Sequence, residues 1–246
     1  MVAARLRERI VDGELPDGGD LPTLERLVQE FAVSPPSIRE ALRILENEGL
    51  ITVRRGSVGG ATVHRPKPEA AAYMLGLVMQ ASQTATEDLA GGLTQLTTVC
   101  AGMCARRKDR RKAVVPALRL AIDNSFRHID DAVEMERWAR QFHNELIKGC
   151  GNQTLILVAG TLESLWARQS EAWTYRVTHA EDAPGSDLRR RGLEEHRAIA
   201  DAIASGEAEL AEKLYREHVR DPEIYSVRNR GARVRATDIM WHSSTR

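Results

Sequence analysis

Aromatic residues and cysteines are both scarce in this sequence. Phe, Trp and Tyr make up 4% of its 246 residues, and there are three cysteines. With so few aromatics the core must be built from Leu, Ile, Val and Ala, which recur mostly at helical spacing and predict a mainly α-helical protein. An odd and low number of cysteines argues against a disulfide framework and favours a reducing compartment, so we expect a cytoplasmic location.

The sequence also lacks an excess of charge of either sign and any long apolar run. Lys and Arg together number 35, as do Asp and Glu, so the net charge gives no sign of nucleic-acid binding. Any contact with DNA must then come from individually placed arginines. No apolar run reaches the roughly 18 residues that a membrane span needs. We therefore expect no membrane association.

Three amphipathic segments and two β-like segments occupy residues 1–65. Leu6 and Ile10 share one face of the first segment, which Gly13 ends; "LPTLERLVQEFAV" forms the second, and the third begins after Ser34. "LITVRR" and "GATVH", joined by "GSVGG", predict a β-hairpin. Three helices followed by a hairpin make a winged helix-turn-helix, whose last helix enters the DNA major groove while the wing touches the backbone or the minor groove.

The exposed face of the third predicted helix carries Ser37, Arg39 and Arg43. Arg39 and Arg43 are four residues apart, so they project from the same side of the helix. Arginine can read guanine with two hydrogen bonds, and serine can bond a phosphate. The alternative is a solvated face whose arginines pair with Glu40 or Glu46. The complete order of three helices and a hairpin favours the first interpretation, with double-stranded DNA as the partner.

This segment resembles the DNA-binding domain of the GntR superfamily. The similarity is carried by "GELPDGGDLPT", by "FAVSPPSIREALRILENEGLI" and by the hairpin "RRGSVGGATV". What the resemblance implies is a set of DNA-facing positions on the third helix and at the wing tip: Ser34, Ser37, Arg39, Arg43, Arg55 and Gly56.

Two departures from the family pattern concern arginines that members use on DNA. Pro35 stands where the family usually has an arginine, and "PTLERL" replaces "PSEREL", so that Glu25 takes the place of an arginine and Arg26 is displaced by one residue. We therefore expect an operator that differs from those of the best-known members, with Arg39 carrying more of the recognition.

The remainder of the chain is predicted to be an all-α antiparallel bundle. "RPKPEA" reads as a linker. Beyond it we expect helices, followed by a partly ordered tail. We expect this tail to be solvated; the alternative is that it contacts DNA or ligand. The predicted organisation is a DNA-binding domain at 1–65, a linker at 66–70, an effector-binding and dimerisation domain at 71–225 and an irregular Arg-rich tail at 226–246. Helices are predicted at 69–83, 86–106, 109–122, 129–150, 153–179, 185–204 and 207–220.

This second region resembles the FCD effector domain of the FadR branch of the same superfamily, through "QFHNELIKGCGNQTL", "LEEHRAIADAIASGEAELA" and "LYREHV". The resemblance implies a divalent metal held by one Asp and three His. His143, His196 and His218 occupy the three His positions, whereas Ala139 replaces the Asp. Three imidazoles can hold Zn or Ni with water completing the coordination. The alternative is that these histidines contact ligand or water without a metal.

The same resemblance bears on the effector. An ungapped alignment puts Leu93 where metal-type members have an arginine that clamps carboxylates, and Thr97 where they have a glutamate. With Ala139, these residues predict a pocket less polar than that of a sugar-acid or lactate sensor. The hypothesis is a fatty acid, an acyl-CoA or another apolar metabolite as effector. The alternative is a metal-containing regulator that senses a small organic acid.

Taken together, the sequence predicts a ligand-responsive transcription regulator, more often a repressor in such families, that binds a pseudo-palindromic operator as a homodimer. The alternative interpretation from a different functional class is a metal-dependent enzyme. The sequence contains no HExxH motif, nucleophile elbow or phosphate loop that would support it. An architectural DNA-binding protein without a ligand is a third interpretation, and the three histidines count against it.

Overall fold

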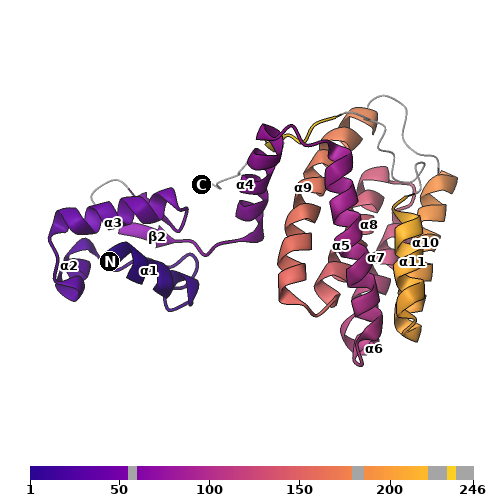
Figure 1. Ribbon diagram of the computed structural model, residues 1–246, viewed down its shortest axis with the longest axis horizontal. Coiled ribbons are helices and arrows are strands. Elements are labelled where there is room, and N and C mark those ends of the chain that lie inside the picture. Colours follow the sequence, from indigo (N-terminus) through magenta and orange to yellow (C-terminus); the bar gives the residue numbers. More distant parts are fainter. Residues whose placement is uncertain (55–59, 179–185, 221–231, 237–246) are drawn as a thin grey trace. The chain divides into compact units, whose positions relative to one another are not determined.

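The computed structural model describes residues 1–54, 60–178, 186–220 and 232–236, without the side chains of Glu69, Ser186 and residues 170–178. The chain forms two compact units, Met1–Lys67 and Pro68–Arg246 (Figure 1). We call them the DNA-binding unit and the helical unit. Helix α4 begins at Pro68, so residues 68–70, expected in the linker, form its first turn.

The DNA-binding unit has the predicted order of elements. Its helices are α1 (Val2–Val11), α2 (Leu24–Phe31) and α3 (Pro35–Asn47), and its strands are β1 (Ile51–Arg54) and β2 (Gly60–Val63). The strands pair antiparallel, Ile51 opposite Val63, and Asp20 adds a bridge to Thr62. These elements enclose a small aliphatic core that includes the fully buried side chains of Leu6, Ile10, Leu27, Ile38 and Leu45.

Local signals in the sequence account for the boundaries of these helices. The side chain of Thr23 accepts a hydrogen bond from the backbone N–H of Arg26 and so caps α2. Pro35 begins α3, where its missing N–H leaves no intrahelical bond unmade. Gly49, with φ of +72°, ends that helix in a conformation that a side chain would strain. These residues therefore fix the start of α2 and both ends of α3.

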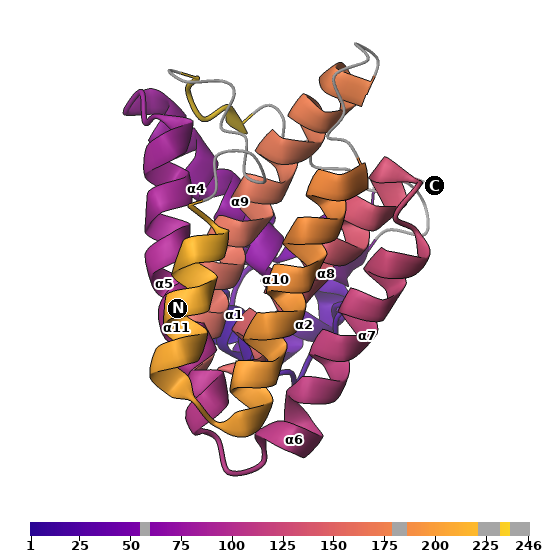
Figure 2. The same ribbon diagram turned by 90° about the vertical axis from the view of Figure 1, so that its right-hand side faces the viewer.

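The helical unit contains α4 and a bundle of seven further helices among its described residues: α5 (Thr86–Arg106), α6 (Arg110–Ala113), α7 (Val115–Arg127), α8 (Ala132–Gly149), α9 (Gln153–Thr178), α10 (Ser186–Ser205) and α11 (Ala208–His218). The long helices contact one another in the cyclic order α5, α11, α10, α7, α8, α9 and back to α5 (Figure 2). Helix α4 (Pro68–Ala81) packs on α9. No helix in these described ranges is long and apolar enough to cross a membrane.

One predicted helix differs from the structure. The span 109–122 divides into α6 and α7, and α7 continues to Arg127. The break falls at Val114, whose ψ of −60° and φ of −121° leave the helical range. Pro116 lies in the first turn of α7, where the ring prevents the preceding turn from continuing as a helix.

The described part of the tail is docked on the helical unit. Val234 and Ala236 are fully buried, and Val234 joins a cluster with Ala72, Leu89 and Leu165 from three helices. The side chain of Gln169 on α9 bonds both the N–H and the C=O of Arg235, at 3.2 and 3.0 Å. Residues 232–236 are thus not a solvated tail; the other residues of 226–246 lie outside the described part.

Candidate functional site: the DNA-binding face and the histidine cluster

The outer face of α3 presents the residues that the sequence singled out. Arg39 is exposed, and its side chain makes no hydrogen bond or ion pair with any residue of the described ranges. Arg43, one turn later, pairs with Glu40 through two hydrogen bonds of 3.0 and 3.1 Å. This pair lowers the pKa of Glu40 and raises that of Arg43. Arg39 is therefore ready for an external partner, whereas Arg43 must exchange its pairing with Glu40, an exposed contact that is easily given up.

The two serines of this face interact with each other. Ser34 lies at the cap position of α3, but its side chain does not cap the helix. Its hydroxyl instead lies 3.0 Å from that of Ser37. Both hydroxyls are exposed beside the first turn of α3, so either can turn to a phosphate. Arg55 and Gly56, predicted at the wing tip, lie outside the described residues.

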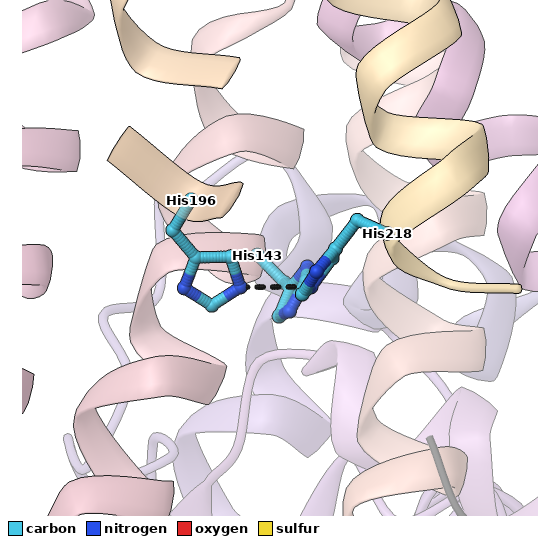
Figure 3. Close-up of side chains that lie close together, drawn as sticks. All are labelled: His143, His196 and His218. Atoms are coloured by element: carbon cyan, nitrogen blue, oxygen red, sulfur yellow. Dashed lines mark hydrogen bonds between the residues drawn. The ribbon is translucent and has the colours of Figure 1, made fainter. Parts of the chain in front are cut away.

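The three predicted histidines meet inside the helical unit. His143 on α8, His196 on α10 and His218 on α11 are buried, and one ring nitrogen of each lies within 4.8 Å of the others. Figure 3 shows the three rings turned toward one another, with the Nε2 atoms of His196 and His218 3.0 Å apart. The convergence that the sequence predicted from three separate helices is present.

Hydrogen-bond partners outside the cluster decide which ring nitrogens have a lone pair available for a metal ion. The Nδ1 atom of His218 lies 2.7 Å from Oε2 of Glu195. A carboxylate only accepts, so Nδ1 of His218 carries the proton and its Nε2 atom presents a lone pair when the ring is neutral. His143 places Nδ1 3.1 Å from the hydroxyl of Tyr215. The Nδ1 atom of His196 is buried without a hydrogen-bond partner in the described part of the chain.

Burial also keeps two of the rings neutral. It lowers the pKa of His143 well below its usual value, and His218 adds to the effect. Burial likewise lowers the pKa of His196, with further contributions from His218 and His143. Neutral imidazole is the form that binds a metal ion. The ring of Phe142 stacks on His196 with centroids 4.1 Å apart, which fixes the orientation of that ring.

The donor set fits a divalent metal of the Zn or Ni type. Two nitrogens bound to one ion at about 2.1 Å lie about 3.0–3.4 Å apart for right-angle to tetrahedral coordination, and the observed Nε2 separation is 3.0 Å. Metal-binding histidines commonly donate their other N–H to a carboxylate, as His218 does to Glu195. Ala139 offers no ligand atom, and no carboxylate of the described ranges joins the group of three.

The residues predicted to line an effector pocket lie next to this cluster. Leu93 and Thr97 are buried one turn apart on α5, and Thr97 donates to the carbonyl of Leu93 at 2.9 Å. Burial raises the pKa of the Tyr215 hydroxyl, an effect that the nearby Thr97 side chain reduces, and this hydroxyl in turn reaches His143. Ala139 lies one turn before His143 on α8. Thr97 on α5 and Ala139 on α8 therefore lie near the histidines, Thr97 through Tyr215 and Ala139 through the turn that it shares with His143.

Three residues of this region were not singled out from the sequence: Glu195, Tyr215 and Glu163. Glu195 directly precedes His196, and Tyr215 lies one helical turn before His218, so proximity to predicted ligands was the available signal. Glu163 is the only charged residue in the stretch from Gln153 to Trp166. A charge isolated in an apolar helix segment is a signal for a buried functional group.

Comparison with known proteins identifies the two domains of the chain. The family model "Bacterial regulatory proteins, gntR family" matches residues 1–61, and the FCD domain matches residues 93–221, more than half of the chain. The HTH-type transcriptional regulator Mce2R of Mycobacterium tuberculosis is 27% identical over 83% of this chain and 81% of its own. The HTH-type transcriptional repressor NanR of Klebsiella aerogenes is 25% identical over 89% of this chain and 82% of its own.

A solved structure supports the fold. The GntR protein of Streptococcus agalactiae superposes with a TM-score of 0.64 at 20% identity, covering 90% of this chain and 97% of that one. The matched families consist of transcriptional regulators, which bind DNA and respond to small molecules and are not enzymes. The chain belongs to the GntR family of regulators, in the FadR-like branch that joins a winged helix-turn-helix to an FCD domain.

Proposed function

We propose that this regulator acts in the cytoplasm as a repressor that binds a pseudo-palindromic operator. The observation that carries the proposal is the exposed α3 face, where Arg39 is unpaired within the described ranges and Ser34 and Ser37 flank the start of the helix. A relative named as a repressor, NanR, supports the sign of regulation. An effector bound in the helical unit would shift the population of dimers able to match the operator.

The test is selection of DNA from a random-sequence library by the purified protein, followed by footprinting of the enriched sequence. We expect two protected half-sites related by a two-fold axis and separated by about one helical turn or more. Enrichment of a single asymmetric site, or of none, would contradict the proposal. Transcription from a promoter carrying the selected site then distinguishes repression from activation.

We further propose that the protein is a homodimer in solution. Helix α4 packs on α9 with one side and exposes Met74, Leu77 and Val78 on another, with exposed fractions of 60, 39 and 60%. A contiguous apolar face of this kind is typical of a protein interface. Sedimentation of Val78→Glu should show a monomer where the wild type is a dimer. If the Val78→Glu protein remained a dimer, the interface would lie elsewhere than on this face of α4.

The histidine cluster is proposed to hold one Zn or Ni ion through His143, His196 and His218. The ion would supply a Lewis-acidic centre for an oxygen atom of the effector. Native mass spectrometry of protein purified without chelator should show one metal per subunit, and His196→Ala should lose it. A metal-free wild type would support the other interpretation, in which the rings contact the effector directly.

The effector is proposed to be a largely apolar metabolite, with fatty acids and acyl-CoA as the first classes to test. Leu93, Thr97 and Ala139 stand where metal-type members carry polar or charged groups, and Leu93 cannot clamp a carboxylate. The second candidate is a small organic acid bound through the metal. Calorimetric titration with small dicarboxylates separates the two, because binding at micromolar concentration would favour the second candidate.

A further inference from the structure

Glu163 on α9 is a buried carboxyl group with no evident structural role. Its exposed fraction is 5%, and among the described residues it makes no hydrogen bond and no ion pair. Burial raises the pKa of this carboxyl to about 7. Native proteins pair nearly all buried polar groups, so each buried group without a partner needs an explanation.

The surroundings of Glu163 place it in the same interior region as the histidine cluster. Its electrostatic neighbours on α8 are Arg140 and Glu136, and Glu163 also acts on Tyr215 of α11. Tyr215 contacts His143 through its hydroxyl. Side chains from α8, α9 and α11 thus surround one polar region beside the candidate metal ligands.

The histidine cluster also contains a buried group without a partner among the described residues. The Nδ1 atom of His196 is buried and unbonded within the described ranges. An apolar residue in place of Glu163 would avoid the cost of burying a carboxyl without a partner. A buried carboxyl at this position is accounted for if a bound molecule supplies a hydrogen-bond donor to it.

We propose that Glu163 is a specificity-determining residue of the effector site, accepting a hydrogen bond from a hydroxyl, amide or amine group of an otherwise apolar ligand. The inference rests on the proposed apolar effector and narrows it. Glu136 and Glu163 already share the single positive charge of Arg140, so the carboxylate of a free fatty acid would add a third acidic group to this region. An uncharged or cationic polar end would meet a matching acceptor, so the structure favours an alcohol, an amide or an amine over a free acid.

The experiment uses three probes with the same ten-carbon chain: decylamine, decanamide and decanoate. Native mass spectrometry and competition titration of the full-length protein give the dissociation constant of each. We expect the amine and the amide to bind at least ten times more tightly than the acid. Glu163→Leu should abolish this preference, and Glu163→Gln should keep the amide but lose the preference for the amine. Glu209→Gln, on the exposed side of α11, should behave as the wild type.

The outcomes separate this inference from the proposed function. If decanoate binds as tightly as the other two, and Glu163→Leu changes nothing, the apolar effector stands and the role of Glu163 is refuted. If none of the three probes binds, a single-chain apolar effector of this size is wrong, and the inference falls with it. A melting temperature for Glu163→Leu several degrees below that of the wild type would assign Glu163 to holding the fold, which also overturns the proposal.

Discussion

In the DNA-binding unit the described side chains proposed to act are exposed and lie on α3 or directly before it, whereas in the helical unit the candidate metal ligands are buried and come from α8, α10 and α11. Ser34 and Arg43 are nine residues apart in the sequence, but His143 and His218 are separated by 75. A surface that binds a large ligand can be built from local periodicity. A site inside a bundle needs the whole packing arrangement.

The same contrast appears in the charges. Arg39 and Arg43 remain in water, where charge is inexpensive, and so they can wait for phosphates and bases. His143, His196 and Glu163 are removed from water. Burial lowers the pKa of the two histidines and raises that of Glu163, and both shifts favour the neutral form of the group. The buried site is therefore governed by protonation and packing, the exposed face by electrostatic attraction to DNA.

The largest effect is expected from a change in the core of one unit. Phe142 is fully buried and stacks on His196, so Phe142→Ala should lower the unfolding free energy of the helical unit by about 3–5 kcal/mol. Scanning calorimetry should show the transition of the DNA-binding unit unchanged. Leu6→Ala is the matched control in the other core and should show the reverse. A common shift of both transitions would show that the units unfold together.

The buried carboxyl of Glu163 predicts a pH dependence. Its pKa is about 7 in the folded protein against an ordinary 4.5, so the folded state holds its proton more tightly than the unfolded state. The stabilisation is complete below about pH 4.5 and is lost as the pH rises through about 7. Relative to Glu163→Gln, the wild type should lose about 3 kcal/mol between these limits. Parallel urea titrations of both proteins across this range provide the measurement, and parallel curves would contradict the prediction.

A substitution on α3 tests the other side of the comparison. Arg39→Ala should weaken binding to the selected operator by about 1–3 kcal/mol, roughly 5- to 150-fold, because a base-reading arginine is lost. Its melting temperature should not change, since the side chain is exposed. Arg43→Ala should cost less, because Arg43 already has Glu40 as a partner. Fluorescence anisotropy gives both affinities, with Arg119→Ala on α7 as the control. Equal affinities of Arg39→Ala and wild type would move the recognition surface away from α3.

The smallest effect concerns the docked tail segment. Gln169→Ala removes two hydrogen bonds to the backbone of Arg235, each of which contributes about 1 kcal/mol. We expect faster hydrogen exchange at the Val234 amide, whose acceptor is the carbonyl of Thr84, and little change in overall stability. Gln153→Ala, at the start of α9, is the control. Exchange as slow as in the wild type would show that burial of Val234 alone holds the segment.

Prediction from the sequence succeeded where the signals are local. Ser34 and Pro35 at the start of α3, Gly49 at its end and the hairpin that follows are all read from neighbouring residues. It failed at the helix expected over 109–122, where Pro116 forces a break that the apolar periodicity conceals. In the tail, the burial of Val234 depends on a surface made by Ala72, Leu89 and Leu165, which no local pattern could reveal.

By itself the sequence determined the family, the two-part organisation, most of the helices and the three helices that carry the histidines, because periodicity, caps and motif spacing act over a few residues. Only the tertiary structure decided which groups join those histidines. It placed Glu195 behind His218 and Tyr215 beside His143, and it buried Glu163 in the same region. These relations depend on how α8, α9, α10 and α11 pack, and packing distances between helices far apart in the chain are set by the whole core.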